Sequence, residues 1–485
     1  MAQIRYFHLT LFLSAVWFTY HVIRLARKAF TGPLSKIPGP LVCRFSNLPL
    51  KLATLQGRRV FFVDGLHHKY GTCVRISPEE FSIVDLPSTR AIHKVGGNYG
   101  KSLWYARFTG ETDGVQSMFS IADSKEHSQR RKQFSNAFSE RALLEFWEPL
   151  VEGRVKLAVQ NIKEKAQTGG ADVLAWFTFM ATDVISELAF GRSFKTLEAG
   201  EKSPYLHDLE HAAIRDMLTE ELSVIMKTIC YLPIPALQHF LGSRQRLIEY
   251  GRSSLQRGKV QENDMTIFSK VFADNGVSAN SLSDFEKIRE AKSMIIAGTD
   301  TTAITLTYLV WAVLKHPEVQ QKLVEEVKTL RPDFSSQDAR KLRYLSMVTD
   351  EALRLYGAVP GGLPRTVPKG GRELGGYFFP EGTVVTTQAY TLHRDPSVFA
   401  QPLEFNPERW ESPTKEMTDA LLPFGAGSRI CIGMHLAKME MALAAATFFR
   451  ECPTARLSSA MTDGMMELEN YFLVAPKGHK CEVVM

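Results

Sequence analysis

The chain has 485 residues, and 45% of them are hydrophobic, which is ample for a folded core and argues against disorder over most of the length. By length it could form two or three domains, although large single domains also occur. The net charge of +6 is modest, and with no recognisable nucleic-acid-binding motif it fits a membrane surface or an acidic partner better than nucleic acid. The six cysteines form no CxxC pair, which argues against a disulfide framework and a zinc site and suits a reducing compartment.

An apolar run near the N-terminus, Tyr6–Ile23, is long enough to span a bilayer as a helix. The basic residues around this run lie mainly after it: Arg24, Arg27 and Lys28, against Arg5 before it. A cleaved signal peptide would carry its charges before the run and a small-residue cleavage site after it, so we favour an uncleaved transmembrane anchor within residues 1–30. The positive-inside rule then places the rest of the chain in the cytoplasm. The prolines within residues 31–41 predict a stiff hinge.

The next part of the chain shows little periodicity. Two short strands, Cys73–Ser77 and Phe81–Val84, are predicted around the turn at Pro78. The glycine- and aromatic-rich stretch 96–119 has no clear period, and we expect it to form loops. The apolar segment 229–237 contains two prolines, so we predict a loop there rather than a helix.

A long helix is predicted from a capping box at Ser283 and Glu286 to Leu314, where Pro317 stops it. Its roughly 30 residues give about 45 Å of helix, enough to cross the whole body. The second half is so apolar that it must be buried, yet residues 297–302 in the middle include an acid and three hydroxyls. Buried polar groups are costly unless they are paired or functional. This segment is therefore either a hydrogen-bonded kink without chemistry or part of an active site.

One cysteine near the C-terminus, Cys431, precedes an apolar-patterned helix that we expect from about Ile432 to Phe449. A thiol at a helix N-terminus faces unpaired N–H groups and the positive end of the helix dipole, so its thiolate is favoured. Arg429 supplies a fixed positive charge for a nearby carboxylate. A lone cysteine, however, is usually a small buried hydrophobe without chemistry.

The glycines around this cysteine favour a bound ligand. Gly425 and Gly427 permit backbone angles that side chains forbid, and Gly433 lets a flat ligand approach closely. Five positions coincide in a pattern that chance seldom supplies: Phe424, Gly427, Arg429, Cys431 and Gly433. The segment therefore predicts a thiolate beneath a large planar cofactor that carries acids, which describes a haem.

Residues 424–433 match the cysteine-ligand signature of the haem-thiolate monooxygenases, so the chain resembles the cytochrome P-450 superfamily. The resemblance covers about Pro33 to the end, and it is to the microsomal eukaryotic type, in particular to fungal members of secondary metabolism. It implies a mainly α fold with small β-sheets, the cytochrome P-450 fold. A single large catalytic domain, residues 42–485, would hold haem b between the long helix and the cysteine loop, and the membrane anchor would precede it.

The resemblance also implies which residues contact the haem. Cys431 would be the axial ligand of the iron, and Phe424, Gly425, Gly433 and Ala297 would lie close to the cofactor. Basic side chains would hold its propionates: His127, Arg131, Arg365 and Arg429.

His127 and Arg131 are four residues apart, so on a helix they share a face. Spacing alone favours a solvated basic helix, but members of the superfamily bear such a pair for the propionates. Arg130 and Lys132 would then point outward, as part of a basic docking face for a reductase.

Further roles follow from the same resemblance. Asp300 and Thr301 match the acid and alcohol that deliver protons during cleavage of the O–O bond. Glu351, Arg354 and Arg409 match a buried structural triad beneath the haem; as an exposed pair the first two would contribute little to stability.

Apolar side chains are candidates for contact with substrate, although ordinary core packing is an equal alternative for each aromatic: Tyr105, Phe108, Phe119, Val359, Leu363 and Phe472. In anchored members of the superfamily the counterpart of segment 229–237 dips into the membrane beside the substrate entrance. An apolar loop is otherwise buried, and the sequence leaves both possibilities open.

We thus expect a monooxygenase that inserts one atom of O2 into an apolar small molecule, in the endoplasmic reticulum membrane with its catalytic domain facing the cytoplasm. Electrons would come from NADPH through a membrane-bound cytochrome P-450 reductase, with cytochrome b5 as a second donor. One alternative is a haem-thiolate isomerase or dehydratase that needs no external electrons, and the other is a haem-binding sensor without catalysis. The acid–alcohol pair Asp300-Thr301 argues against both.

Overall fold

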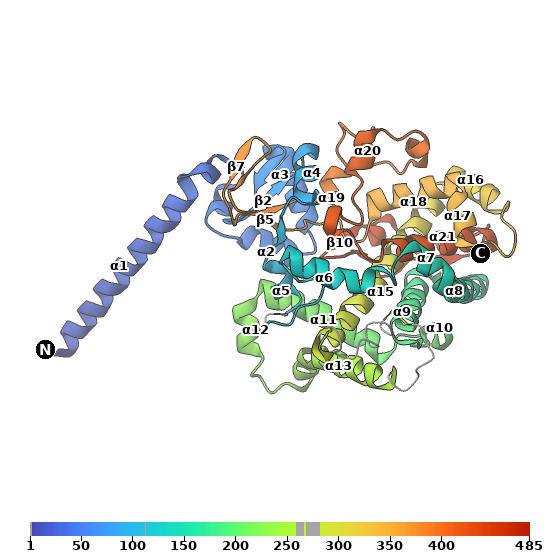
Figure 1. Ribbon diagram of the computed structural model, residues 1–485, viewed down its shortest axis with the longest axis horizontal. Coiled ribbons are helices and arrows are strands. Elements are labelled where there is room, and N and C mark those ends of the chain that lie inside the picture. Colours follow the sequence, from blue (N-terminus) through green and yellow to red (C-terminus); the bar gives the residue numbers. More distant parts are fainter. Residues whose placement is uncertain (1, 112, 259–265, 268–281) are drawn as a thin grey trace.

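The computed structural model describes the whole chain except residues 1, 112, 259–265 and 268–281. The described part is mainly α-helical with small β-sheets, as predicted, and Figure 1 shows a helical body from which the N-terminal helix α1 (Ala2–Phe30) extends. The longest helices build this body: α8 (Glu148–Thr168), α9 (Val173–Phe190), α11 (Pro204–Glu221), α13 (Pro235–Gly258), α15 (Asp284–Lys315), α18 (Arg343–Tyr356) and α21 (Met434–Glu451).

Shorter helices cover the long ones: α2 (Leu48–Leu55), α3 (Arg59–Tyr70), α4 (Leu86–His93), α5 (Trp104–Phe108), α6 (Ser124–Ser135), α7 (Glu140–Ala142), α10 (Thr196–Ala199), α12 (Ser223–Ile229), α16 (Pro317–Val327), α17 (Ser336–Lys341), α19 (Ala389–Leu392) and α20 (Lys415–Ala420). The strands are short: β1 (Cys73–Arg75), β2 (Glu80–Ile83), β3 (Gly100–Lys101), β4 (Ala171–Asp172), β5 (Arg365–Thr366), β6 (Arg372–Leu374), β7 (Tyr377–Phe379), β8 (Val384–Thr386), β9 (Arg456–Leu457), β10 (Leu468–Asn470), β11 (Val474–Pro476) and β12 (Glu482–Val484).

The largest sheet has the strand order β1-β2-β8-β5-β3. β1 and β2 pair antiparallel with Cys73 opposite Ile83, which confirms the two strands predicted around Pro78. β1 ends earlier than predicted because the N–H groups of Ile76 and Ser77 both bond to the Glu80 carbonyl, which makes a turn instead of a ladder.

The long helix α15 crosses the middle of the body and packs along α9. The predicted capping box is present: the Ser283 hydroxyl accepts from the Glu286 N–H, and the Glu286 carboxylate accepts from the Ser283 N–H. Gly298 permits the close approach of the two helices, because a Cβ at this position would lie 2.8 Å from Ile185 Cγ1 on α9. The middle of α15 is thereby held at the centre of the molecule.

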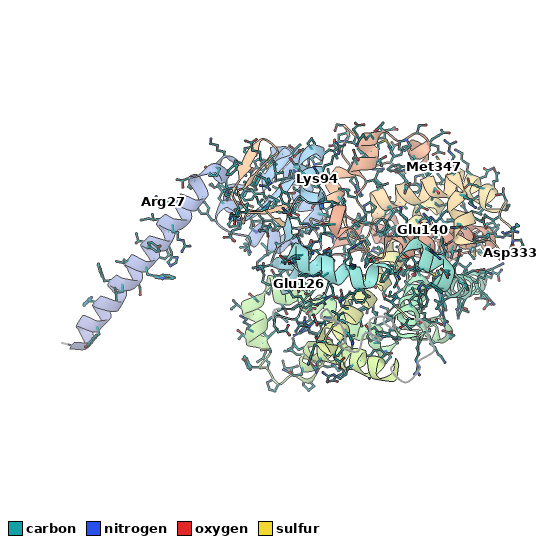
Figure 2. The ribbon with its side chains drawn as sticks, viewed as in Figure 1. Arg27, Lys94, Glu126, Glu140, Asp333 and Met347 are labelled. Carbon is teal, nitrogen blue, oxygen red and sulfur yellow. The ribbon has the colours of Figure 1, made fainter. Side chains whose placement is uncertain are left out.

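Apolar side chains are exposed along α1: Leu11, Phe12, Leu13, Val16, Trp17, Phe18, Val22 and Ile23. Figure 2 shows Arg27 on the half of this helix nearest the body. Among the residues that the structure describes, the helix long and apolar enough to cross a membrane is α9, but most of it is buried within the core. α9 is therefore a core helix.

The segment between α12 and α13 is a loop, but it is shorter than predicted, because Ile229 ends α12 and Pro235 begins α13. This loop is not buried. Tyr231 is 85% exposed, and Leu232 and Ile234 are also exposed. Burial was one of two expectations for this segment and it is wrong, because α12, which leads into the loop, is itself uncovered at Val224 and Ile225 in its first turn.

Candidate active site

The cysteine loop is a closed turn that delivers Cys431 to the start of α21. The Cys431 N–H donates to the Phe424 carbonyl at 2.9 Å. Gly433 is the N-cap of α21, which begins at Met434, two residues later than predicted. Gly425 and Gly427 have φ angles of 68° and 66°, in the left-handed region that glycine favours. At Gly427 no other residue fits, because a Cβ would lie 1.7 Å from the His93 carbonyl oxygen.

Cys431 lies deep in the protein but keeps an accessible sulfur. Burial raises the pKa of its thiol, while the Gly433 N–H and the charges of Arg131 and Lys101 lower it. The side chain is nevertheless exposed. A Cβ on Gly433 would meet nothing nearer than this sulfur, at 3.9 Å. The sulfur therefore faces an internal space with backbone and positive charge arranged to favour the thiolate.

The middle of α15 borders an internal space as well. Ala297 is exposed although Ile295 and Thr299 beside it are buried. Thr301 donates its hydroxyl to the Ala297 carbonyl at 2.7 Å, so both residues lie on the same face. Burial raises the pKa of Asp300 to about 6, with a further rise from Glu210 and an opposing effect of Lys202. A half-buried carboxyl with this pKa exchanges protons near neutral pH.

Next to this face α15 is joined to the cysteine helix. The Thr302 hydroxyl donates to a carboxylate oxygen of Glu440, which is buried on α21, at 3.2 Å. Because this bond joins the helix that begins beside Cys431 to the turn that carries Ala297 and Thr301, we infer that the two open faces border one space.

A cluster of basic side chains lies beside the cysteine loop. Its members come from four separate places in the chain, since two of them share α6: Lys101, His127, Arg131, Arg365 and Arg429. Burial and the other four charges lower the pKa of His127 to about 3. Burial and the charges of Arg365, Arg429 and Arg131 lower the pKa of Lys101 well below its usual range, against an opposing effect of Glu111. Burial and Arg365 lower the pKa of Arg429 to about 10. Because these charges oppose one another, an anion placed among them would stabilise the folded protein.

The cluster is fixed by hydrogen bonds that the sequence did not reveal. Arg131 donates to the Ile430 carbonyl at 2.7 Å, and this bond ties α6 to the cysteine loop. Arg365 donates to the Tyr105 hydroxyl at 3.0 Å. Arg429 donates to three backbone carbonyls just before α6: Ile121, Ala122 and Asp123. Arg429 therefore docks the cysteine loop on α6, in addition to the charge that it brings.

Lys101 is the member of this cluster that sequence analysis missed. It lies on the two-residue strand β3, donates to the Phe119 carbonyl, and places its ammonium 4.4 Å from the Tyr105 ring centroid. A strand this short gives no periodic pattern, so the position of Lys101 could not be recognised from the chain alone.

A buried charge network lies below the cysteine loop. Glu351 and Arg354 form a double hydrogen bond at 2.8 Å, and Arg409 donates to the same carboxylate at 2.9 Å. Trp410 Nε1 donates to the second oxygen of Glu351 at 2.9 Å. The three residues predicted to pair are thus brought together.

Arg130 does not point outward, so the docking face predicted for it is wrong. It is 6% exposed and is paired with Glu290 at 2.8 Å and with Glu286, both on α15. The basic segment alone gives no sign of these acids, because they lie more than 150 residues further along the chain. Lys132 is exposed, as expected.

Comparison with known proteins decides the family. The model of the cytochrome P-450 family matches residues 37–483. The chain belongs to the cytochrome P-450 family. It is 41% identical over 463 residues to cytochrome P-450 monooxygenase tazI of Aspergillus terreus, covering 94% of each chain. It is 35% identical to cytochrome P-450 monooxygenase stcB of Emericella nidulans, covering 96% of this chain and 91% of that one. It is also 34% identical to cytochrome P-450 monooxygenase cypX of Dothistroma septosporum, covering 98% and 95%.

This P-450 is an oxidoreductase of the monooxygenase class, as predicted. Its family implies a haem, electrons from a redox partner and a small-molecule substrate. The residues present fit the haem. An accessible thiol lies beside Gly433, and the basic cluster around Lys101 and His127 lacks only anions such as two propionates to balance it.

The P-450's predicted substrate residues fall into two groups. Tyr105, Phe108, Phe119 and Phe472 meet in one aromatic cluster, in which ring centroids lie 4.9 to 6.0 Å apart. Trp104, which the sequence analysis did not single out, stacks on Phe108 at 4.7 Å within the same cluster.

Leu363 lies against the cysteine loop. Leu363 Cδ1 is 3.7 Å from the position of a Cβ on Gly425, next to the cysteine loop, and Val359 is half-buried. Tyr105 is only 1% exposed and holds Arg365 through its hydroxyl. The stretch 96–119, expected to be loop, contains the strand β3 and the short helix α5, which carries Trp104, Tyr105 and Phe108; its other described residues are loop.

Proposed function

We propose that this P-450 uses haem b, ligated by Cys431, to insert one atom of O2 into an apolar small molecule. Two observations support the proposal: the exposed side chain of Cys431 among positive charges, and the exposed Ala297 on α15 whose carbonyl accepts the hydrogen bond of Thr301. When bound, the haem supplies the redox chemistry that activates dioxygen, so that one oxygen atom enters the substrate and the other leaves as water. Two electrons and two protons balance this reaction.

The cysteine side of the protein holds the cofactor. The Gly433 N–H and the charge of Arg131 favour the thiolate form of Cys431. Lys101, His127 and Arg365 provide positive charge and donors for the propionates, and Arg429 holds the loop in place. Phe424 closes the other side of the loop through its carbonyl.

On the opposite side, Asp300 and Thr301 manage protons. The pKa of Asp300, about 6, allows the carboxyl to take up a proton from solvent and release it inward. The Thr301 hydroxyl is held by the Ala297 carbonyl, and it can pass a hydrogen bond into the space that Ala297 borders. This pair is the proposed route for the two protons.

The proposed location is the endoplasmic reticulum membrane, with α1 as a single-pass anchor and residues 31–41 as a hinge. The exposed apolar side chains of α1 and the exposed loop at Tyr231–Ile234 support this location, because both would leave water for lipid. Arg27 lies on the half of α1 nearest the body, which supports a cytoplasmic catalytic domain (Figure 2). Electrons would come from NADPH through the membrane-bound reductase, with cytochrome b5 as a second donor.

We further propose a role in fungal secondary metabolism, on the likeness to the three fungal monooxygenases. The test of the reaction is expression with a NADPH-dependent reductase under ¹⁸O2 on a set of apolar probes. One labelled oxygen atom per product molecule is expected, and only when NADPH is present. Products that form without NADPH would identify an isomerase or dehydratase, and haem and probe binding without any product would identify a sensor.

A further inference from the structure

A narrow cleft opens beside the aromatic cluster, between α5, the end of α11 and the β10–β11 hairpin. Its aromatic wall consists of Trp104, Phe108 and Phe472. Trp104 and Phe108 are nearly parallel, at an angle of 16°, and Phe108 and Phe472 lie 4.9 Å apart. Trp104 and Phe108 stack on each other while Phe472 is tilted by 46° against Phe108, so a flat ring that enters beside them would find the same kind of contact.

One extended segment borders both the cleft and the cysteine loop. Gly361, Gly362 and Pro364 line the cleft. Leu363, between them, approaches Gly425 of the cysteine loop. A molecule in the cleft is therefore next to the site where the proposed oxidation takes place.

The side chain of Asn470, which lines the cleft, is a buried polar group held in one orientation. It is 1% exposed, and its Nδ2 donates to the carbonyls of Phe472 and Leu473 at 3.2 and 3.4 Å. These two bonds fix the orientation of the amide, since the oxygen could not bond to a carbonyl. Oδ1 then has no hydrogen-bond partner among the residues that the structure describes. It lies 4.0 Å from the position of a Cβ on Gly361, on the side of the cleft.

A buried acceptor without a partner costs about 1–3 kcal/mol, so the fold retains Asn470 at a penalty that a hydrogen-bond donor would remove. The charged groups at the mouth of the cleft do not compete for this role, because each is already paired: Arg59 with Glu80, Glu220 with Arg107 and Glu221 with Lys51. The cleft thus combines flat apolar walls, paired charges and, at Asn470, a buried acceptor without a partner among the described residues.

We propose that the cleft binds a neutral, flat aromatic ring system that carries a hydroxyl group, and that Asn470 Oδ1 accepts the hydrogen bond of this hydroxyl. This assignment rests on the proposed monooxygenase function and names the class of its substrate. Trp104, Phe108 and Phe472 bind the ring, and Asn470 selects the hydroxylated ring over its unsubstituted counterpart.

The test uses the full-length, haem-loaded protein and two probes, 2-naphthol and naphthalene, whose dissociation constants are measured by titration calorimetry. The result is expressed as the ratio of the two dissociation constants. Both probes have the same ring system, so its contribution to binding cancels and the ratio reports the hydroxyl group. In Asn470→Ala the preference for 2-naphthol should fall at least about fivefold relative to the unchanged protein, which is the value of one neutral hydrogen bond.

Two further variants make the result specific. Gly361→Ala places a methyl group in ordinary contact with Oδ1, where the hydroxyl would lie, and leaves the Nδ2 bonds of Asn470 intact. It should lower the preference as Asn470→Ala does, and it decides the question if Asn470→Ala does not fold. Asn161→Ala is the matched control, because the Asn161 amide also donates to a backbone carbonyl but lies on α8.

A preference for 2-naphthol that is unchanged in Gly361→Ala or in folded Asn470→Ala would overturn the assignment, as would an equal loss in Asn161→Ala. The reduced carbon-monoxide spectrum and turnover with the reductase are recorded on the same samples. If these are normal while the preference does not depend on Asn470, the substrate class is wrong and the monooxygenase function stands. If haem binds and no probe is oxidised, the proposed reaction itself fails.

Discussion

The two sides of the active site are held by different kinds of interaction. On the cysteine side, Arg354 and Glu351 are buried and bonded to each other and to backbone carbonyls. On the cleft side, Trp104, Phe108 and Phe472 meet only through ring faces and edges. Charge-assisted hydrogen bonds fix distance and direction, whereas apolar contacts allow rings to move past one another. The charge network is therefore fixed in place, whereas the aromatic wall of the cleft can repack.

The largest effect is expected from breaking the rigid side. Arg354→Met leaves the buried Glu351 carboxylate without its main partner, which should lower the free energy of unfolding by about 3–5 kcal/mol and reduce the yield of haem-loaded protein. Phe108→Leu on the cleft side is the matched substitution and should cost less than about 2 kcal/mol. Urea denaturation followed by circular dichroism measures both. Equal losses in the two variants would show that the sides do not differ.

Next in size is the loss of proton delivery. Asp300→Asn and Thr301→Val should each keep the haem spectrum but lower product formed per NADPH by about 10²-fold, since a positioned acid–base group contributes that much. Thr307→Val is the control, because Thr307 makes the same type of bond to the Ala303 carbonyl further along α15. Unchanged coupling in Asp300→Asn would remove this residue from the mechanism.

A smaller effect is expected at the basic cluster. One substitution there should stabilise the haem-free protein but weaken the retention of haem by the loaded protein. Lys101→Met removes a buried charge that its neighbours oppose, so the haem-free protein should become more stable. The haem-loaded protein should release its cofactor about tenfold faster, because one propionate loses a charged donor. Haem transfer to an excess of a globin acceptor measures the release. A variant that is destabilised in both forms would mean that Lys101 only supports the fold.

The smallest expected effect is a change in pH dependence at the junction of α15 and α21. Burial raises the pKa of Glu440 to about 8. Between its unfolded pKa of about 4.3 and about 8 the folded state then binds more protons than the unfolded state, so stability falls as pH rises through this range. Glu440→Gln should flatten the decline, by at most about 1.4 kcal/mol per pH unit.

Urea midpoints measured at several pH values test this effect. Glu451→Gln, an exposed carboxylate at the end of the same helix, is the control and should leave the slope unchanged. If the slope is the same in Glu440→Gln as in the unchanged protein, the buried carboxyl does not titrate in this range.

Much of this fold could be predicted from capping residues, prolines and glycines, because the effect of each on the backbone depends only on residues close to it in the chain. The capping box at Ser283 and the stop at Pro317 placed both ends of α15 within one or two residues of their positions. The glycines around Cys431 marked its loop for the same reason, since their backbone angles are a local requirement.

What the sequence could not reveal depends on segments that meet only in three dimensions. Arg130 was expected at the surface, but carboxylates on α15 draw it inside. Lys101 gave no pattern, and the unpaired oxygen of Asn470 becomes visible only when the hairpin tip is folded around its amide. Such contacts decide which polar groups remain free for a ligand.

The most direct measurement of the proposed cofactor site is the absorption spectrum of the reduced, carbon-monoxide-bound protein. The unchanged protein and the control Cys230→Ser, which alters another exposed thiol, should show the red-shifted Soret band of thiolate ligation. Cys431→Ala should lose this band. A band that persists in Cys431→Ala, or that the unchanged haem-loaded protein never shows, would contradict ligation by Cys431.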